Sequence, residues 1–131
     1  MPVWNECDPV THADQTLPRC ARTPNCVCSE YADASRFIDP FVCPQNIASA
    51  WQSLLEVGLN FPGARLVERG PDRLCFECRT GVFRFVDDLM FRLDQESGLI
   101  HVRSASRLGF WDFGKNRRRV EEVRRRWERT F

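Results

Sequence analysis

The spacing of apolar residues changes from a helical period to a strand period near residue 64. From Ile47 to Leu55, apolar side chains recur at helical intervals, and Gly58 and Pro62 follow, so the spacing predicts an amphipathic helix that ends near Gly58. Beyond this helix, apolar and polar residues alternate with a period of two, which is typical of half-buried strands. The predicted strands lie at residues 64–69, 73–80, 82–94 and 99–107.

A second helix is predicted after the strands. Short turns join neighbouring strands in an antiparallel meander, and Asn116 is placed to cap the final helix after a loop at residues 108–114. The apolar stripe of this helix contains Val120, Val123, Trp127 and Phe131. Because each helix has one apolar side, we expect both helices to cover one face of the sheet. The predicted fold is α+β, with a four-stranded antiparallel meander sheet, two helices packed on one face and an irregular N-terminal arm.

Residues 1–46 form the predicted arm, and residues 47–131 form an α-β-β-β-β-α core of a single domain. The arm is rich in Pro, Asp, Thr, Ser and Cys and shows neither a helical nor a strand period. A length of 131 residues suits one domain with one core. The sequence shows neither a stretch of roughly 18 apolar residues nor the pattern of an export signal, so we expect a soluble cytoplasmic protein without a membrane span.

Asp87 interrupts the apolar pattern of the third predicted strand. The other odd positions of this strand are mainly apolar, so the Asp87 side chain falls on the face that packs against the core. A hairpin loop of four residues places Asp87 opposite Ser106 on the next strand, with Ser104 two residues before it. A buried carboxylate needs hydrogen-bond donors, and we expect the two serine hydroxyls or amides of the following loop to supply them.

The opposite face of the same strand pair carries an Arg-Asp-Arg cluster. The predicted register places Asp88 opposite Ala105, with Arg103 and Arg107 as the diagonal neighbours of Asp88. Forked guanidinium groups suit a phosphate or carboxylate ligand, but Asp88 already supplies an anion, so we favour Asp88 as their partner. The alternative is a small enzyme whose site combines these arginines with Asp88, or with Asp87 as a general base.

Four short motifs resemble a known protein family. They are PNCV at residues 24–27, FVDD at 85–88, VRSASR at 102–107 and DFGKNR at 112–117. In order and spacing they are similar to the family called domain of unknown function 1499, and the resemblance spans most of the chain without implying a reaction. The candidate polar cluster is Asp87, Asp88, Arg103, Ser104, Ser106, Arg107, Asp112, Asn116 and Arg117. Within it, we expect Arg117 to pair with Asp112.

Several of the seven cysteines of the chain fall in the arm. Cys20, Cys26 and Cys28 have the residue type of a thiolate metal site, although they lack its usual paired spacing. For Cys20 and Cys26 the alternatives are a zinc site, a redox-dependent disulfide or ordinary thiols. Cys75 and Cys78 belong to one strand and point to opposite faces, so we do not expect them to share an ion. No other cofactor is predicted.

The final helix is strongly basic, although the formal net charge of the chain is only +1. Glu121 and Glu122 lie within helical reach of several of its arginines, which favours a solvated, locally paired face over a nucleic-acid contact. We therefore predict a non-enzymatic binding or assembly module that meets a protein or small ligand through the arm and a loop with Phe110 and Trp111. A metal-binding or redox protein acting through arm cysteines is a further alternative.

Overall fold

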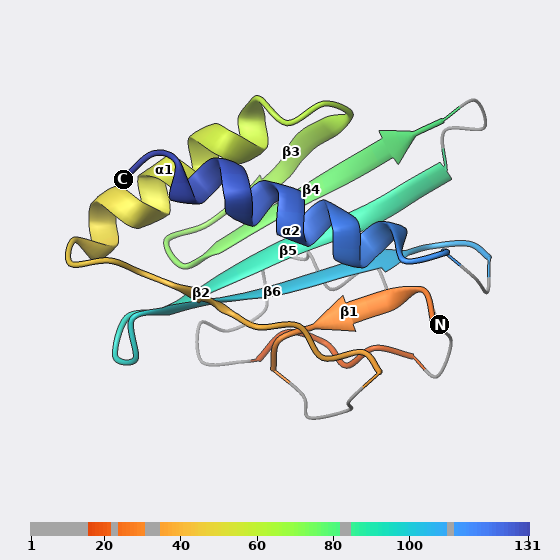
Figure 1. The fold of residues 1–131 in the computed structure, drawn as a ribbon, viewed down its shortest axis with the longest axis horizontal. Helices are drawn as coiled ribbons and strands as arrows, with labels where there is room; N and C mark the ends of the chain where they lie inside the picture. The colour runs from red at the N-terminus through yellow and green to blue at the C-terminus, as the bar shows by residue number, and fades with distance from the viewer. Residues whose placement is uncertain (1–15, 22–23, 31–34, 82–84, 110–111) are drawn as a thin grey trace.

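The computed structural model describes residues 16–21, 24–30, 35–81, 85–109 and 112–131. In these parts of the chain, one antiparallel sheet carries two helices on one of its faces (Figure 1). The strands are β1 (Cys26–Cys28), β2 (Phe41–Val42), β3 (Ala64–Arg69), β4 (Arg73–Thr80), β5 (Phe85–Asp94) and β6 (Leu99–Ser106). The helices are α1 (Ile47–Leu59) and α2 (Lys115–Glu128). The α+β class is therefore confirmed.

The strands from β3 to β6 form the predicted antiparallel meander. The order in the sheet is β1-β6-β5-β4-β3, and β2 also pairs with β6. Asp87 of β5 pairs with Ser106 of β6, which confirms the predicted register of this hairpin. The strand ends differ slightly from the prediction. β6 ends one residue earlier, and β5 begins at Phe85, whereas residues 82–84 of the predicted strand lie outside the described residues.

The sheet has six strands in the described residues instead of the predicted four, because the arm contributes β1 and β2. Both lie antiparallel to β6: Val27 pairs with Ser104, and Phe41 pairs with Ile100. The prediction of a wholly irregular arm is therefore wrong. Strands of three and two residues are too short to show a period in the sequence, and they form by pairing with the β6 edge, which lies far away along the chain.

Two glycines have structural reasons at the helices. α1 ends at Leu59, near Gly58 as predicted, and residue 58 is a glycine because a Cβ there would come within 2.3 Å of the Phe76 ring. Gly114, with a φ of 78°, takes the N-cap position of α2. The prediction that Asn116 caps this helix is therefore wrong. The Asn116 side chain instead turns inward and is fully buried.

The main hydrophobic core lies between the helices and the sheet. Trp127 of α2 is buried and donates its indole N–H to the Ala50 carbonyl of α1 at 2.9 Å. Val120 and Val123 are buried in the same core, which confirms the predicted stripe for these three residues. Phe131 departs from the prediction, because it follows the helix and is 55% exposed. Neither helix of the described chain has the length and apolarity of a membrane span.

A second, smaller apolar cluster lies on the other face of the sheet. Leu17 and Cys28 from the arm pack there with Cys75 of β4 and Met90 of β5. All four side chains are buried. The arm therefore covers the face that the helices leave open, and this cover explains why Cys75 is buried although it points away from the main core.

Candidate functional site

Asp87 lies on the helix-covered face of β5 and is fully buried, as its place in the alternating pattern indicates. Its Oδ2 atom accepts a hydrogen bond from Arg119 Nη2 at 2.6 Å and forms an ion pair with Lys115 Nζ at 3.1 Å. The prediction that Ser104, Ser106 or loop amides satisfy this carboxylate is wrong. Cations from α2 take their place, because opposite charge stabilises a buried carboxylate better than neutral hydroxyl groups do.

Asn116 connects the arm, the sheet and the loop before α2. Its side-chain oxygen accepts hydrogen bonds from Ser104 Oγ at 2.6 Å and from Arg119 Nη1 at 2.8 Å. Its Nδ2 donates to the Asn25 carbonyl at 3.1 Å, to Ser106 Oγ at 3.0 Å and to Asp112 Oδ2 at 2.9 Å. Because one buried amide makes all these contacts, Asn116 fixes the positions of β1, β6 and the loop relative to α2.

The Asp112 carboxylate is held by N–H groups on both oxygens. Its Oδ1 accepts from the Gly114 backbone at 2.8 Å, and its Oδ2 accepts from the backbone and the side chain of Asn116. Burial acts to raise the pKa of Asp112, but these hydrogen bonds outweigh burial and hold the pKa below its usual range. The predicted pair of Arg117 with Asp112 is wrong, because Arg117 donates instead to the Ser35 carbonyl at 3.3 Å.

On the opposite face of the sheet, Arg107 binds two carboxylates. Its Nε and Nη2 atoms donate to the two oxygens of Asp88 at 2.8 Å each, and Nη2 also donates to Glu77 Oε2 at 2.9 Å. The hydrogen bonds with Asp88 outweigh burial and, together with the bond to Glu77, raise the pKa of Arg107. Sequence reasoning missed Glu77, although the pairing of β4 with β5 sets it opposite Asp88.

The candidate polar cluster is thus divided between the two faces of the sheet. On the arm-covered face, Arg103 is buried and donates through Nη2 to the Arg19 carbonyl at 3.5 Å. Asp88 and Arg107 share this face. The helix-covered side holds Asp87, Ser104, Ser106, Asp112, Asn116 and Arg117. A catalytic role for either group stays a prediction.

Cys20 and Cys26 form a disulfide that joins two parts of the arm, the segment before β1 and β1 itself. Of the three predicted alternatives for Cys20 and Cys26, a zinc site, a disulfide or ordinary thiols, the structure contains the disulfide. Cys28 is a free, buried thiol, and burial raises its pKa. Cys78 lies in the main core, where burial raises its pKa to about 11, and Cys75 lies on the other face as predicted. Within the described ranges, no three or more His, Cys, Asp or Glu side chains are grouped to hold a metal ion.

The disulfide leads to a stability prediction. Replacing Cys20 and Cys26 together with serine is expected to lower the free energy of unfolding by about 2 kcal/mol, because the bond closes a short loop in the unfolded chain. Urea unfolding with and without a reductant measures this loss. The control Cys43→Ser removes a free thiol and is expected to keep the response to reductant. Seven free thiols in the oxidised, denatured protein would contradict the disulfide.

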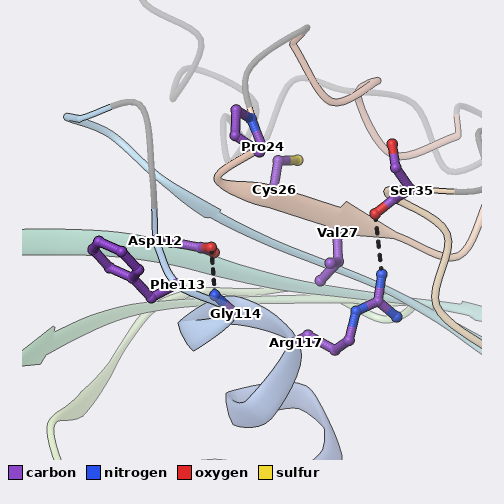
Figure 2. A pocket seen from close by; sticks show the side chains of 8 residues that line it. All are labelled: Pro24, Cys26, Val27, Ser35, Asp112, Phe113, Gly114 and Arg117. Atoms are coloured by element: carbon purple, nitrogen blue, oxygen red, sulfur yellow. Dashed lines mark hydrogen bonds between the residues drawn. The ribbon is translucent and has the colours of Figure 1, made fainter.

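A cavity of about 690 Å³ lies between β1 and the start of α2 (Figure 2). Among the described residues, its lining consists of Pro24, Cys26, Val27, Ser35, Asp112, Phe113, Gly114 and Arg117. Apolar side chains therefore meet two charged residues in one concave surface. From the predicted polar cluster, Asp112 and Arg117 contribute to this lining.

The cavity is separate from the residues that were predicted to form the site of a small enzyme. Asp87 is enclosed in the main core, and Asp88, Arg103 and Arg107 lie on the arm-covered face. None of them belongs to the lining of the cavity. The predicted contact loop with Phe110 and Trp111 lies outside the described residues. The described part of the chain therefore directs attention to β1 and the first turn of α2.

Phe113 combines exposure with an uncommon backbone conformation on the cavity lining. Its side chain is 84% exposed, and its φ of 54° lies in the left-handed region that bulky residues seldom adopt. Arg118 Nη1 donates to the Phe113 carbonyl at 2.6 Å and helps to hold this turn. Sequence reasoning missed Phe113, because no residue pattern indicates that a phenylalanine adopts a positive φ.

The arginines in the second half of α2 pair locally, as predicted. The ion pairs are Arg124 with Glu121, and both Arg125 and Arg126 with Glu122. Arg119 differs, because it is buried against Asp87 rather than placed on the solvated face. The expectation that the helix does not bind nucleic acid stays a prediction.

Comparison with known proteins identifies one family. The family described as "Protein of unknown function (DUF1499)" matches residues 16–126 of the chain. The match confirms the resemblance inferred from the four motifs, all of which lie within the matched residues. No curated protein matches the chain.

Proposed function

The chain belongs to the DUF1499 family, and we propose that it is a non-enzymatic binding module whose ligand lies in the cavity between β1 and α2. The observation that carries this proposal is the cavity together with the exposed aromatic side chain of Phe113 on its lining. Concave surfaces with apolar walls and a few convergent polar groups are the usual form of small-ligand sites. The binding role is the one predicted from the sequence, now placed at the cavity between β1 and α2.

The size and the lining of the cavity suit a small ligand. Its volume of about 690 Å³ falls within the range of roughly 300 to 1,000 Å³ that is typical of such sites. Pro24, Val27 and Phe113 supply apolar surface, whereas Ser35 and Arg117 supply polar groups. A small ligand can therefore bury an apolar part and still make specific polar contacts.

The walls of the cavity are held in place by contacts within the protein. β1 pairs with β6, and the disulfide ties Cys26 to Cys20. The side chain of Asn25 donates to the Gly109 carbonyl at 2.7 Å, so the segment before β1 is also tied to the loop before α2. A preformed wall loses little conformational entropy when a ligand binds, which favours affinity.

The carboxylates near the cavity favour binding over catalysis. Both oxygens of Asp112 accept hydrogen bonds from N–H groups of the loop and α2. Asp87 is fully buried in its ion pair with Arg119. A general base must reach the proton that it abstracts directly or through one water molecule. Asp87 is therefore not placed for this role toward a ligand in the cavity, and the hydrogen bonds that hold the pKa of Asp112 low make that carboxylate a weak base.

Replacing Phe113 with asparagine is expected to separate binding from stability. The uncharged fluorescent probe N-phenyl-1-naphthylamine should bind the wild-type protein, and Phe113→Asn should weaken binding by about tenfold, because apolar lining is lost. The free energy of unfolding should stay unchanged or rise by up to about 1 kcal/mol, because asparagine tolerates a positive φ better. Fluorescence titration and urea unfolding measure the two effects.

Phe131→Asn is the matched control for probe binding. Phe131 is also an exposed aromatic residue, but it follows the last turn of α2, away from the cavity. We expect this variant to bind the probe as the wild-type protein does. Unchanged probe binding in Phe113→Asn would show that the proposed lining does not form the site.

A further inference from the structure

We infer that the ligand of this cavity is a small amphipathic anion with an apolar body and one carboxylate, phosphate or sulfonate group. The inference rests on the proposed binding function and specifies the chemistry of its ligand. Arg117 carries the inference, because its half-buried side chain brings a guanidinium group to the lining of the cavity.

The Arg117 guanidinium has hydrogen-bond donors available for a ligand. Figure 2 shows its side chain extending from α2 toward Ser35, on the side of the cavity that Val27 also borders. The bond to the Ser35 carbonyl, at 3.3 Å, is its only side-chain hydrogen bond within the described residues. A guanidinium carries five N–H donors in a planar fork, so Arg117 can bind an anion in addition to Ser35.

Arg117 has no carboxylate partner in the part of the chain that the structure describes. Arg119, one half-turn further along α2, pairs with Asp87. Asp112 also lines the cavity, but its oxygens accept hydrogen bonds from N–H groups of the loop and α2 and not from Arg117. An anionic ligand would therefore supply the ion-pair partner that Arg117 lacks, through charge-assisted hydrogen bonds.

The surroundings of Arg117 add positive charge. A second hollow of about 540 Å³ borders the cavity and is lined by Gly114, Arg117, Arg118, Glu121 and Arg125. Glu121 is engaged by Arg124, and Arg125 is engaged by Glu122, so Arg117 and Arg118 are the cations of this lining without a carboxylate partner among the described residues. Clustered positive charge at a concave surface raises the local concentration of anions.

The rest of the lining requires an apolar body on the ligand. Phe113 and Arg117 lie on the two sides of Gly114 in Figure 2, and Val27 points toward α2 from β1. Pro24 also belongs to the lining. An anionic group bound to Arg117 places the remaining atoms of the ligand against these apolar side chains. An inorganic anion would leave the apolar surface uncovered, so the lining favours an amphipathic molecule.

Two fluorescent probes with the same ring system test this inference on the full chain. 1-Anilinonaphthalene-8-sulfonate carries a sulfonate group, and N-phenyl-1-naphthylamine lacks it. We expect the sulfonate probe to bind the wild-type protein about tenfold more tightly than the uncharged probe. Arg117→Gln should weaken the binding of the sulfonate probe by about tenfold and change the affinity for the uncharged probe by less than about twofold. Arg117→Lys should keep part of the preference for the sulfonate probe.

Arg129→Gln is the control, because it removes the same charge from the exposed end of α2 and should leave the binding of both probes unchanged. Equal affinity of the wild-type protein for the two probes, or an equal loss of both in Arg117→Gln, would overturn the anionic ligand and leave the binding function intact. If neither probe binds the wild-type protein, the binding function fails as well.

Discussion

Replacing Arg119 with methionine is expected to lower the free energy of unfolding by about 3 to 5 kcal/mol. Arg119 is buried and donates to Asp87 at 2.6 Å and to Asn116 at 2.8 Å. Methionine fills a similar length but carries no charge, so the Asp87 carboxylate would stay in the core with only Lys115 as an ion-pair partner. Urea unfolding measures the loss.

Arg125→Met is the matched control for this prediction. The Arg125 side chain is 57% exposed and pairs with Glu122 on the surface of α2, so its loss should change stability by less than about 1 kcal/mol. A double variant, Asp87→Leu with Arg119→Met, removes both buried charges and should recover at least half of the loss. If Arg119→Met were no less stable than Arg125→Met, the buried ion pair would have no stabilising role.

Replacing Asn116 with alanine is expected to lower the free energy of unfolding by about 2 to 4 kcal/mol. The variant loses the side-chain oxygen that accepts hydrogen bonds from Ser104 and Arg119. It also loses the N–H groups that donate to the Asn25 carbonyl, Ser106 and Asp112, of which Asn25 and Asp112 keep backbone donors. Buried polar groups without partners are costly, and these groups belong to several different elements. Urea unfolding again measures the effect.

Asn60→Ala provides the comparison for Asn116→Ala. Asn60 is exposed, and its side chain makes one hydrogen bond, to the Glu56 carbonyl at the end of α1. Its replacement should cost less than about 1 kcal/mol. Similar losses in the two variants would mean that the contacts of Asn116 do not act together to connect the arm, the sheet and α2.

The meander from β3 to β6 could be predicted because the patterns that specify it lie within each strand and between neighbouring strands. Each strand is long enough to show alternation, and the hairpin between β5 and β6 sets Asp87 opposite Ser106 once its loop length is known. The same alternation predicts the burial of Asp87. Local pattern therefore accounts for the register and for which side chains face the helices.

The arm strands could not be predicted because their pairing is not local. β1 and β2 are short, and each pairs with β6, far away along the chain. The partner of Asp87 was missed for a related reason. Arg119 lies in a run of arginines that resembles a solvated helix face, and only the packing of α2 on the sheet shows that it is buried.

The candidate site was predicted in part. Asp112 and Arg117 were included through the family motif, and both line the cavity. Phe113, between them in the chain, was missed because its exposure and positive φ depend on how Gly114 and the loop begin α2. The contribution of Cys26 also depends on long-range pairing, since β1 brings it beside the start of α2.

The most direct test of the proposed binding site is the map of backbone amide shifts in ¹⁵N-labelled protein during titration with 1-anilinonaphthalene-8-sulfonate. We predict saturable shift changes concentrated at Val27, Gly114 and Arg117, which line the cavity, and unchanged signals at Val67 in β3. Saturable changes centred on β3 instead, or no saturable change at any residue, would contradict a ligand site between β1 and α2.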